Sequence, residues 1–442
     1  MIDICIIGGG ASGIIAAISA RMENPHASIC ILEKSDKLGK KLLATGNGRC
    51  NFSNTSCKNS NEILNFFYEL GIKSRVEEQG RIYPYSGQAQ DVLNALVTYL
   101  ITHDIKVNTN LPVSGLSVKT KSIDIVDSDG HLNIVNSDGY IDIISGSKKI
   151  SAKAVLVATG GKAGPQFGCS GDGHKIAREL GHTVTKTIPA LSPVECKGNF
   201  EYLKGIRAKA LVTLIKKSKP SDPDKDEKVI ASEVGEVQFT EYGLSGICIL
   251  NLSRNIIIGG DCGSNFEDYA ISVDLLYDMS LKEVAQELSM RRNNPNISDN
   301  NLLISLVPKR LADFVLNRAG VSVAKVNEGD ALLALVCDGQ IKQIKHIFDD
   351  DQIERIAYTL KNLTFTVTNV KGWKFAQSTS GGISTDEIDM DTMESKIVKG
   401  VYFSGELIDY DGPCGGYNLN NAWETGIKAG MAMARKVTES NV

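Results

Sequence analysis

Residues 2–13 read Ile-Asp-Ile-Cys-Ile-Ile-Gly-Gly-Gly-Ala-Ser-Gly, and the rest of the chain can be organised around this stretch. The run 2–7 is apolar with little alternation, as expected for a parallel strand buried on both faces. Gly8, Gly10 and Gly13 fill the pattern G-x-G-x-x-G. The first glycine permits a tight turn, the second lets backbone approach a pyrophosphate, and the third lets a helix pack against the strand. The small residues that follow suit a helix whose N-terminal amides face phosphates.

A second expected strand, 27–32, ends in Glu33, twenty residues beyond Gly13. An acid at this spacing can accept hydrogen bonds from both hydroxyls of an adenosine ribose. Lys34 beside it weakly favours a phosphorylated ribose, but the carboxylate would repel that phosphate. Strand, glycines, helix, second strand and acid occur in the required order, so the sequence predicts a dinucleotide site. A glycine-rich turn without a ligand is the alternative.

Length and composition set limits on fold and partners. A chain of 442 residues exceeds the size at which single cores stop growing, so two or three domains are expected. The formal net charge of −4 gives no overall reason to expect nucleic acid or an anionic membrane as a partner. No apolar run is long enough to span a membrane, and the N-terminus lacks the basic flank of a signal peptide. We therefore expect a cytoplasmic protein.

The ten cysteines include neither a C-x-x-C pair nor a zinc spacing, and the six histidines show no paired spacing. Reduced cytosolic thiols are the expected state, and no metal site is predicted.

Three further segments have the character of ligand-binding turns. The loop 34–54 combines three glycines with several cations, and could wrap an anion, with a solvated basic loop as the alternative. The expected strand 154–157 enters the small-residue turn 158–161, which would bring backbone close to a cofactor, although any tight turn could use it. After an expected strand at 401–403, Gly415 and Gly416 precede a small-residue helix. That helix start would supply amides and a dipole to a second part of one extended ligand.

Patterns in the middle of the chain predict other structure. Segment 117–150 favours an antiparallel meander with turns at Asp-Gly, Asp-Gly and Ser-Gly. Segment 190–260 alternates as strands do, with a charged insertion at 216–228 expected to be disordered. Segment 281–361 is mostly helical in pattern.

On these motifs the chain resembles bacterial FAD-binding flavoproteins labelled aminoacetone-oxidase-family or NAD(P)/FAD-dependent oxidoreductases, which include a reductase of bile-acid ring double bonds. The resemblance covers nearly the full length and rests on GGGASG, GKKLLATGNGRCNFSN, GRIYPYSGQA, FTEYGLSG and SGELIDYDGPCGGYNLNNAWETG. It implies an α/β fold with a Rossmann-like FAD domain of the two-dinucleotide-binding type built from both chain ends, 1–188 and 365–442. It also implies a β-barrel-like inserted domain at 189–280, returning near 345–364, and a helical subdomain at 281–344.

The resemblance also implies roles along the cofactor. The glycine turn would hold the pyrophosphate, Glu33 the ribose and the Val113 backbone the adenine. Polar residues of 40–51 would lie along the phosphates and ribityl chain, which 405–409 would close. The helix start at 416–418 would stabilise the negative charge of reduced flavin.

Related flavoproteins commonly carry aspartate where this chain has Glu406, so Asp409 is an alternative acid at the ribityl chain. The residues expected to bind FAD are Gly8, Gly10, Ala11, Ser12, Gly13, Glu33, Lys34, Lys40, Lys41, Gly46, Gly48, Arg49, Cys50, Asn51, Val113, Ala158, Thr159, Gly160, Gly161, Gly405, Glu406, Asp409, Gly415, Gly416, Tyr417 and Asn418.

The implied function is an FAD-dependent oxidoreductase that transfers hydride through flavin to or from a small or steroid-like organic substrate, such as a conjugated double bond. NADH or NADPH is the candidate diffusible reductant. No second complete G-x-G-x-x-G follows a strand, so a separate NAD(P)H domain is not expected. Either the reductant enters the same cleft as the substrate, or another protein supplies the electrons. Tyr83, Tyr85 and Tyr417 are candidate proton donors, although core or stacking roles are the commoner use of tyrosine. Cys50 and Cys414 are a less favoured redox pair, because disulfide reductases of this fold place two cysteines four apart on one helix.

Two alternatives stay open. A flavin-containing RNA-modifying or regulatory binding protein is disfavoured by the acidic balance and the lack of an arginine-rich, aromatic-interleaved stretch. A nicotinamide dehydrogenase without flavin would need only the first glycine turn. Substrate, catalytic residue and oligomeric state are not fixed by the sequence.

Overall fold

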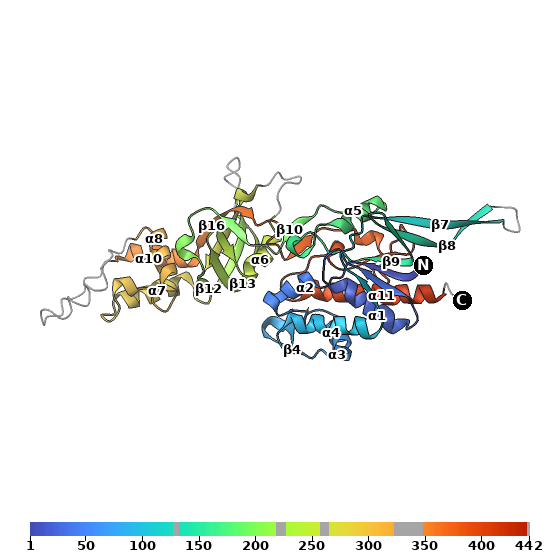
Figure 1. Ribbon diagram of the computed structural model, residues 1–442. Helices are drawn as coiled ribbons and strands as arrows, with labels where there is room; N and C mark the ends of the chain where they lie inside the picture. The colour runs from blue at the N-terminus through green and yellow to red at the C-terminus, as the bar shows by residue number, and fades with distance from the viewer. Residues whose placement is uncertain (127–131, 218–226, 257–264, 322–347, 440–442) are drawn as a thin grey trace. The chain divides into compact units, whose positions relative to one another are not determined.

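The computed structural model describes residues 1–126, 132–217, 227–256, 265–321 and 348–439 (Figure 1). The chain divides into two compact units. Unit 1 comprises Met1–Ala190 and Gly372–Val442, so both ends of the chain belong to it, and unit 2 comprises Leu191–Lys371.

Unit 1 is built on a seven-stranded sheet in the order β6-β2-β1-β9-β8-β7, with β18 also paired to β9. The strands are β1 (Ile2–Ile7), β2 (Ile29–Leu32), β6 (Lys106–Asn108), β7 (Gly115–Val126), β8 (Leu132–Ser145), β9 (Lys148–Val157) and β18 (Val401–Phe403). The pairings β1 with β2 and β9, β2 with β6, and β9 with β18 are parallel, whereas β7, β8 and β9 pair antiparallel. This is the doubly wound arrangement expected of a Rossmann-like sheet with an antiparallel extension, and the predicted α/β class is confirmed.

The first and last helices of the chain pack against each other at very short range. These are α1 (Ala11–Glu23) and α11 (Tyr417–Glu439). A Cβ added at Gly426 would lie 2.5 Å from the Ser12 carbonyl oxygen, and one at Gly430 would lie 2.3 Å from that of Ala16. Glycines in α11 therefore let its backbone touch that of α1, which explains why both helices are rich in small residues.

Smaller elements complete unit 1. Its other helices are α2 (Lys40–Ala44), α3 (Ser60–Glu69), α4 (Ala89–Thr102) and α5 (Asp172–Glu179). Its other strands are β3 (Ser53–Asn54), β4 (Ser74–Val76) and β5 (Arg81–Pro84), which form one sheet, and β10 (Ile188–Ala190) and β17 (Ser378–Ser380), which form another.

Unit 2 contains a closed antiparallel barrel in the order β11-β14-β13-β12-β15-β16. Its strands are β11 (Val194–Cys196), β12 (Arg207–Lys216), β13 (Lys228–Thr240), β14 (Gly243–Ser245), β15 (Tyr269–Asp274) and β16 (Leu363–Val370). Its helices are α6 (Ile247–Ser253), α7 (Leu281–Arg292), α8 (Lys309–Arg318) and α10 (Asp350–Lys361). Phe200, Phe239 and Phe365 pack together in its core. The predicted barrel-like and helical parts are confirmed within these residues.

One predicted turn of the meander is wrong. Strand β8 runs through Asp138 and Gly139, because Lys119 pairs with Tyr140 and Lys121 with Ser137 across a local irregularity in the ladder. Pairing with β7 therefore overrides the turn preference of Asp-Gly. The turn at 145–146 is confirmed by Gly146, whose φ is +58°. The Asp-Gly at 129–130 and most of the insertion at 216–228 lie outside the described residues.

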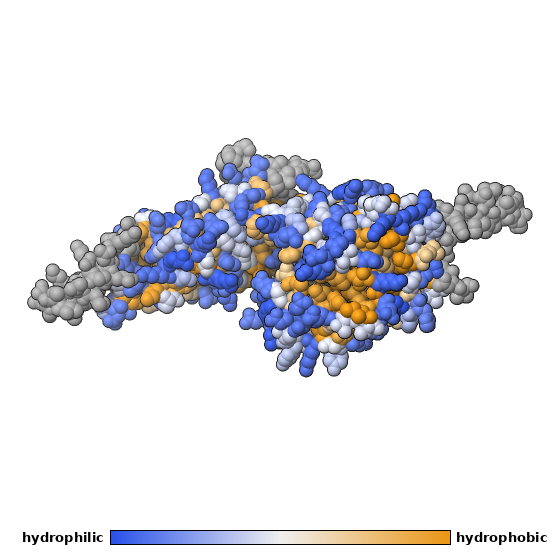
Figure 2. All heavy atoms as spheres, viewed as in Figure 1, coloured by the Kyte–Doolittle hydropathy of each residue, from blue (hydrophilic) through white to orange (hydrophobic). Residues whose placement is uncertain are grey.

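Within the described part of the chain, no helix is both long enough and apolar enough to cross a membrane. Hydrophilic residues cover much of the visible surface of each unit, and an apolar area is visible on unit 1 (Figure 2).

Candidate functional site

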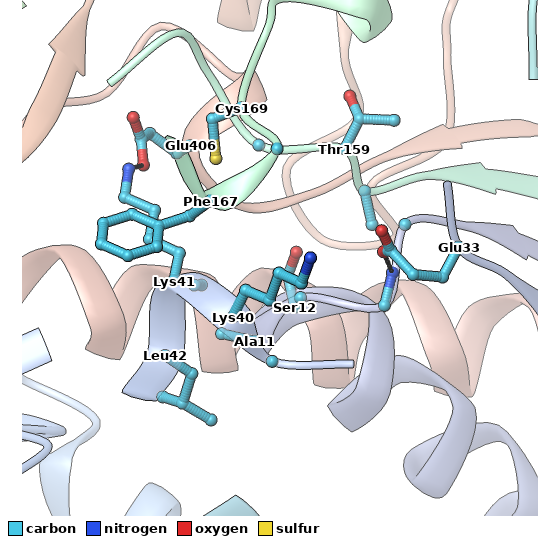
Figure 3. Close-up of a pocket in the computed structure, with 18 of the residues that line it drawn as sticks. Ala11, Ser12, Glu33, Lys40, Lys41, Leu42, Thr159, Phe167, Cys169 and Glu406 are labelled. Atoms are coloured by element: carbon cyan, nitrogen blue, oxygen red, sulfur yellow. Dashed lines mark hydrogen bonds and ion pairs between the residues drawn. The ribbon is translucent and has the colours of Figure 1, made fainter. Parts of the chain in front are cut away.

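Unit 1 contains a pocket with about 1220 Å³ of space, its open mouth included. Its wall is formed by the turn after β1, the end of β2, helix α2, the loop after β9, and the start of α11 (Figure 3). The pocket thus lies at the carboxyl ends of the parallel strands, where open α/β sheets bind ligands.

The glycine turn that opens the pocket is shaped by backbone contacts. Gly8 has a φ of +110°, and a Cβ there would lie 2.4 Å from the Ala158 carbonyl oxygen. A Cβ at Gly13 would lie 2.0 Å from the Gly8 carbonyl oxygen, whereas one at Gly10 would meet nothing within 4 Å. Gly8 and Gly13 therefore serve the fold, and Gly10 leaves open space beside the first turn of α1. No side chain caps α1, so its first amides remain for a ligand or water.

Glu33 is held at the pocket wall by two backbone amides. One carboxylate oxygen accepts from Gly9 N at 2.7 Å and the other from Ser35 N at 2.7 Å. Each oxygen keeps a further lone pair, so the carboxylate can still accept from a diol. The ammonium of neighbouring Lys34 lies 2.5 Å from Asp172 and also bonds Ser170. This pairing holds Lys34 toward the start of α5.

Glu406 lies at the opposite part of the pocket from Glu33, next to Lys41 (Figure 3). It forms an ion pair with Lys41, and its other oxygen accepts from the Thr379 hydroxyl at 2.8 Å. Asp409, the alternative acid, accepts from the Thr185 hydroxyl at 2.8 Å and does not belong to the pocket lining.

The structure brings together just over half of the residues expected to bind the cofactor. Those that line the pocket are Gly8, Gly10, Ala11, Ser12, Glu33, Lys34, Lys40, Lys41, Val113, Ala158, Thr159, Gly160, Glu406 and Asn418. Those outside its lining are Gly13, Gly46, Gly48, Arg49, Cys50, Asn51, Gly161, Gly405, Asp409, Gly415, Gly416 and Tyr417.

Residues 49 and 50 make contacts within the protein. The Arg49 guanidinium lies 2.6 Å from Glu77 and over the ring of Tyr83, 4.1 Å from its centroid. Cys50 is fully buried, and this burial raises the pKa of its thiol to about 12. Such a thiol stays protonated at neutral pH, which argues against redox chemistry at Cys50.

Segment 51–54 is hydrogen-bonded to the start of α11. The Asn51 amide oxygen accepts from Gly416 N at 3.2 Å, and Asn54 donates to the Gly415 carbonyl at 3.0 Å. Two further bonds, Ser53 to Asn420 at 2.7 Å and Trp423 to the Phe52 carbonyl at 3.0 Å, are buried. Residues separated by more than 360 positions therefore fix the helix start beside the pocket.

The sequence reasoning missed several residues that line the pocket, namely Phe167, Cys169, Asp172, Gln377 and Tyr410. A signal for the first three was present in the sequence, because glycines recur along the loop after β9, at 160, 161, 164, 168 and 171. In the structure those at 160, 164, 168 and 171 adopt a positive φ. Their spacing indicates a loop that turns sharply several times next to a strand end. No comparable local signal marks Gln377 or Tyr410.

The structure also assembles a Ser-His-Glu arrangement that the sequence did not indicate. His182 Nδ1 lies 3.1 Å from Glu387, and His182 Nε2 lies 2.8 Å from the Ser395 hydroxyl. Ser395 and His182 are buried and lie outside the pocket, and the Ser395 hydroxyl also accepts from two backbone amides. This group is a structural cross-link, because its serine has neither access to substrate nor a free lone pair for nucleophilic attack.

Comparison with known proteins identifies the family of the chain. The family model described as "HI0933-like protein Rossmann domain" matches residues 2–62 and 58–432. A 3-dehydro-bile acid delta(4,6)-reductase of Clostridium scindens is 32% identical over 98% of both chains. Ribosomal RNA dihydrouridine synthases of Escherichia coli and Haemophilus influenzae are 26% and 23% identical, over 96% and 98% of both chains respectively. The predicted resemblance to a group that includes a bile-acid reductase is confirmed. The chain belongs to the HI0933-like Rossmann-domain family.

Proposed function

We propose that the chain is an FAD-dependent oxidoreductase that reduces a carbon–carbon double bond conjugated with a carbonyl group. The observation that carries this proposal is the 32% identity, over 98% of both chains, with a reductase of a 3-dehydro bile acid. A 3-dehydro group is a ketone, and delta(4,6) double bonds are conjugated with it. Such a bond is polarised, so its far carbon can accept hydride.

The residues that line the pocket suit FAD. The open space at Gly10 and the uncapped start of α1 would receive the pyrophosphate. Glu33 would accept hydrogen bonds from the hydroxyls of the adenosine ribose, and Val113 would lie beside the adenine. The buried hydroxyl of Thr159 lines the pocket and makes no hydrogen bond within the described chain, so it would be available to the cofactor.

FAD, when bound, supplies hydride transfer. The chain's own residues would orient the flavin and tune its reduction potential. The start of α11, fixed by Asn51 and Asn54, would direct its amides and dipole at the electron-rich part of the ligand. NADH or NADPH is the proposed diffusible reductant, and the substrate would be a small or steroid-like enone.

The test is to purify the protein, identify any released cofactor by chromatography, and follow anaerobic reduction by NADH and NADPH. The reduced protein is then offered a 3-oxo-4,6-diene steroid and its saturated 3-oxo counterpart. We expect bound FAD and reoxidation by the dienone alone. A colourless protein that cannot be reconstituted with FAD would refute the proposal.

A second candidate is reduction of uridine in RNA, which the whole-length similarity to two ribosomal RNA dihydrouridine synthases favours. The chemistry is of the same type, because dihydrouridine is formed by saturating a double bond conjugated with a ring carbonyl. Ribosomal RNA belongs in the same substrate panel. Reoxidation by RNA and not by the dienone would select this alternative.

A further inference from the structure

Thr379 has a hydroxyl whose direction is fixed by its surroundings. The residue is fully buried in unit 1. Its hydroxyl oxygen accepts from Lys162 N at 2.8 Å and from Ala163 N at 3.0 Å. Its hydrogen bonds to Glu406 Oε1 at 2.8 Å. Because two amides occupy the lone pairs, the hydrogen is left with one acceptor, the carboxylate.

Glu406 is in turn held from three directions. Its Oε1 also accepts from Thr379 N at 3.0 Å, and its Oε2 pairs with the Lys41 ammonium (Figure 3). A Cβ at Gly161 would lie 2.4 Å from the Thr379 hydroxyl and 2.8 Å from Glu406 Oε1. The backbone after β9 therefore packs directly on this pair, which accounts for a glycine at position 161.

We propose that Thr379 is a positioning residue that holds the Glu406 carboxylate away from the phosphates of the dinucleotide and thereby keeps the Lys41 ammonium at the pocket wall. Glu406 and Lys41 both line the pocket, with side chains 18% and 25% exposed, so solvent screens them only partly. FAD carries two negative phosphates. Without the hydroxyl bond the carboxylate is held only by the Thr379 amide and Lys41, so it would turn toward the phosphates, repel them and draw Lys41 with it. This inference rests on the proposed FAD function.

The experiment measures the FAD dissociation constant by quenching of flavin fluorescence in the reconstituted full chain. T379V should weaken FAD binding by about tenfold, the scale of one lost charge-assisted hydrogen bond. T379S keeps the hydroxyl and should stay within about threefold of wild type by the same reasoning. T379A replaces T379V if the valine variant does not fold. Alanine leaves room for a water molecule, which can accept from the amides of 162 and 163 in place of the lost hydroxyl.

The discriminating variant is T379V/E406Q. A loose amide does not repel phosphates, so the double variant should bind FAD more tightly than T379V alone. A purely structural role for Thr379 predicts no recovery in the double variant, because the bonds to the amides of 162 and 163 are equally lost in both backgrounds. T185V is the matched control, since that hydroxyl also bonds a carboxylate and a glycine amide of unit 1, at 2.8 Å and 2.9 Å, outside the pocket lining. It should bind FAD as wild type does.

Two results would overturn the proposal while leaving the FAD function intact: wild-type affinity in both T379V and T379A, or no recovery in T379V/E406Q. A wild-type chain that binds no FAD would instead overturn the proposed function itself.

Discussion

Alanine substitutions at Gly10 and Gly13 of the glycine turn should affect different properties: G10A the affinity for FAD, and G13A the stability of the apoprotein. In G10A the new methyl group meets no atom within 4 Å, and the backbone of Gly10, with φ −87° and ψ −168°, is accessible to alanine. Alanine is a poorer helix cap than glycine, but it also lowers the entropy of the unfolded chain, and these effects of about 0.5–1 kcal/mol nearly cancel. We expect the free energy of unfolding of the apoprotein to stay within about 0.5 kcal/mol of wild type.

That methyl group projects into the space where the pyrophosphate would approach. Displacing the phosphates would weaken about two charge-assisted hydrogen bonds, or about 3 kcal/mol, so FAD affinity should fall about 100-fold. G13A differs, because its Cβ would lie 2.0 Å from the Gly8 carbonyl oxygen, and Cβ atoms in real proteins essentially never approach another heavy atom within 3.0 Å. Helix α1 would have to move, at a strain of about 3 kcal/mol that helix propensity offsets by about 1 kcal/mol.

Urea unfolding of both apoproteins and FAD titration by fluorescence quenching check these expectations. The reasoning fails if G10A binds FAD as tightly as wild type, since the dinucleotide would then not approach Gly10. It fails equally if G10A destabilises the apoprotein as much as G13A does.

Three further predictions follow from the described contacts. Burial lowers the pKa of His174 to about 4 from 6.5. The unfolded chain therefore protonates first as the pH falls, and the free energy of unfolding should drop between about pH 6.5 and pH 4, by at most about 3 kcal/mol. Urea unfolding across this range should show a shallower drop for H174Q, and equal slopes would contradict the assignment. N54A removes the partly buried bonds from Asn54 to the Gly415 and Gln79 carbonyls and the bond that Ser56 N donates to the Asn54 side chain. It should destabilise the protein by about 2 kcal/mol and weaken FAD binding, measured as above; unchanged FAD affinity would show that the α11 start is fixed by other contacts. C414S should retain enone reduction in anaerobic turnover assays, because Cys50 is buried with a raised thiol pKa, and loss of turnover would revive a redox role for the pair.

The parts of the fold that the sequence predicts well are those set by local pattern. The apolar run of β1, the glycine spacing and the start of α1 depend on residues within about a dozen positions of one another, and the structure has them as expected. The turn predicted at Asp138–Gly139 fails because pairing of β8 with β7 decides the conformation there.

The candidate site shows the same division. Glu33 could be picked out by its spacing from Gly13, and it lines the pocket. Thr379 could not, because its hydrogen-bond partners at 162, 163 and 406 are distant in sequence. Nor could spacing show that Asp409 bonds Thr185 and that Glu406 lines the pocket instead. The two acids are only three residues apart, and the local backbone conformation decides which of them faces the pocket.

The bonds between segment 51–54 and the start of α11 bear on how the protein is made. On the ribosome, Gly416 emerges about 360 residues after Asn51, an interval on the order of tens of seconds at ordinary elongation rates. During that time β1 and α1 can form on either side of the first glycine turn, but the part of the pocket wall that the start of α11 supplies does not yet exist. FAD should therefore bind late in synthesis. A nascent chain stalled before α11 should bind FAD poorly, although it already carries the complete glycine turn 8–13.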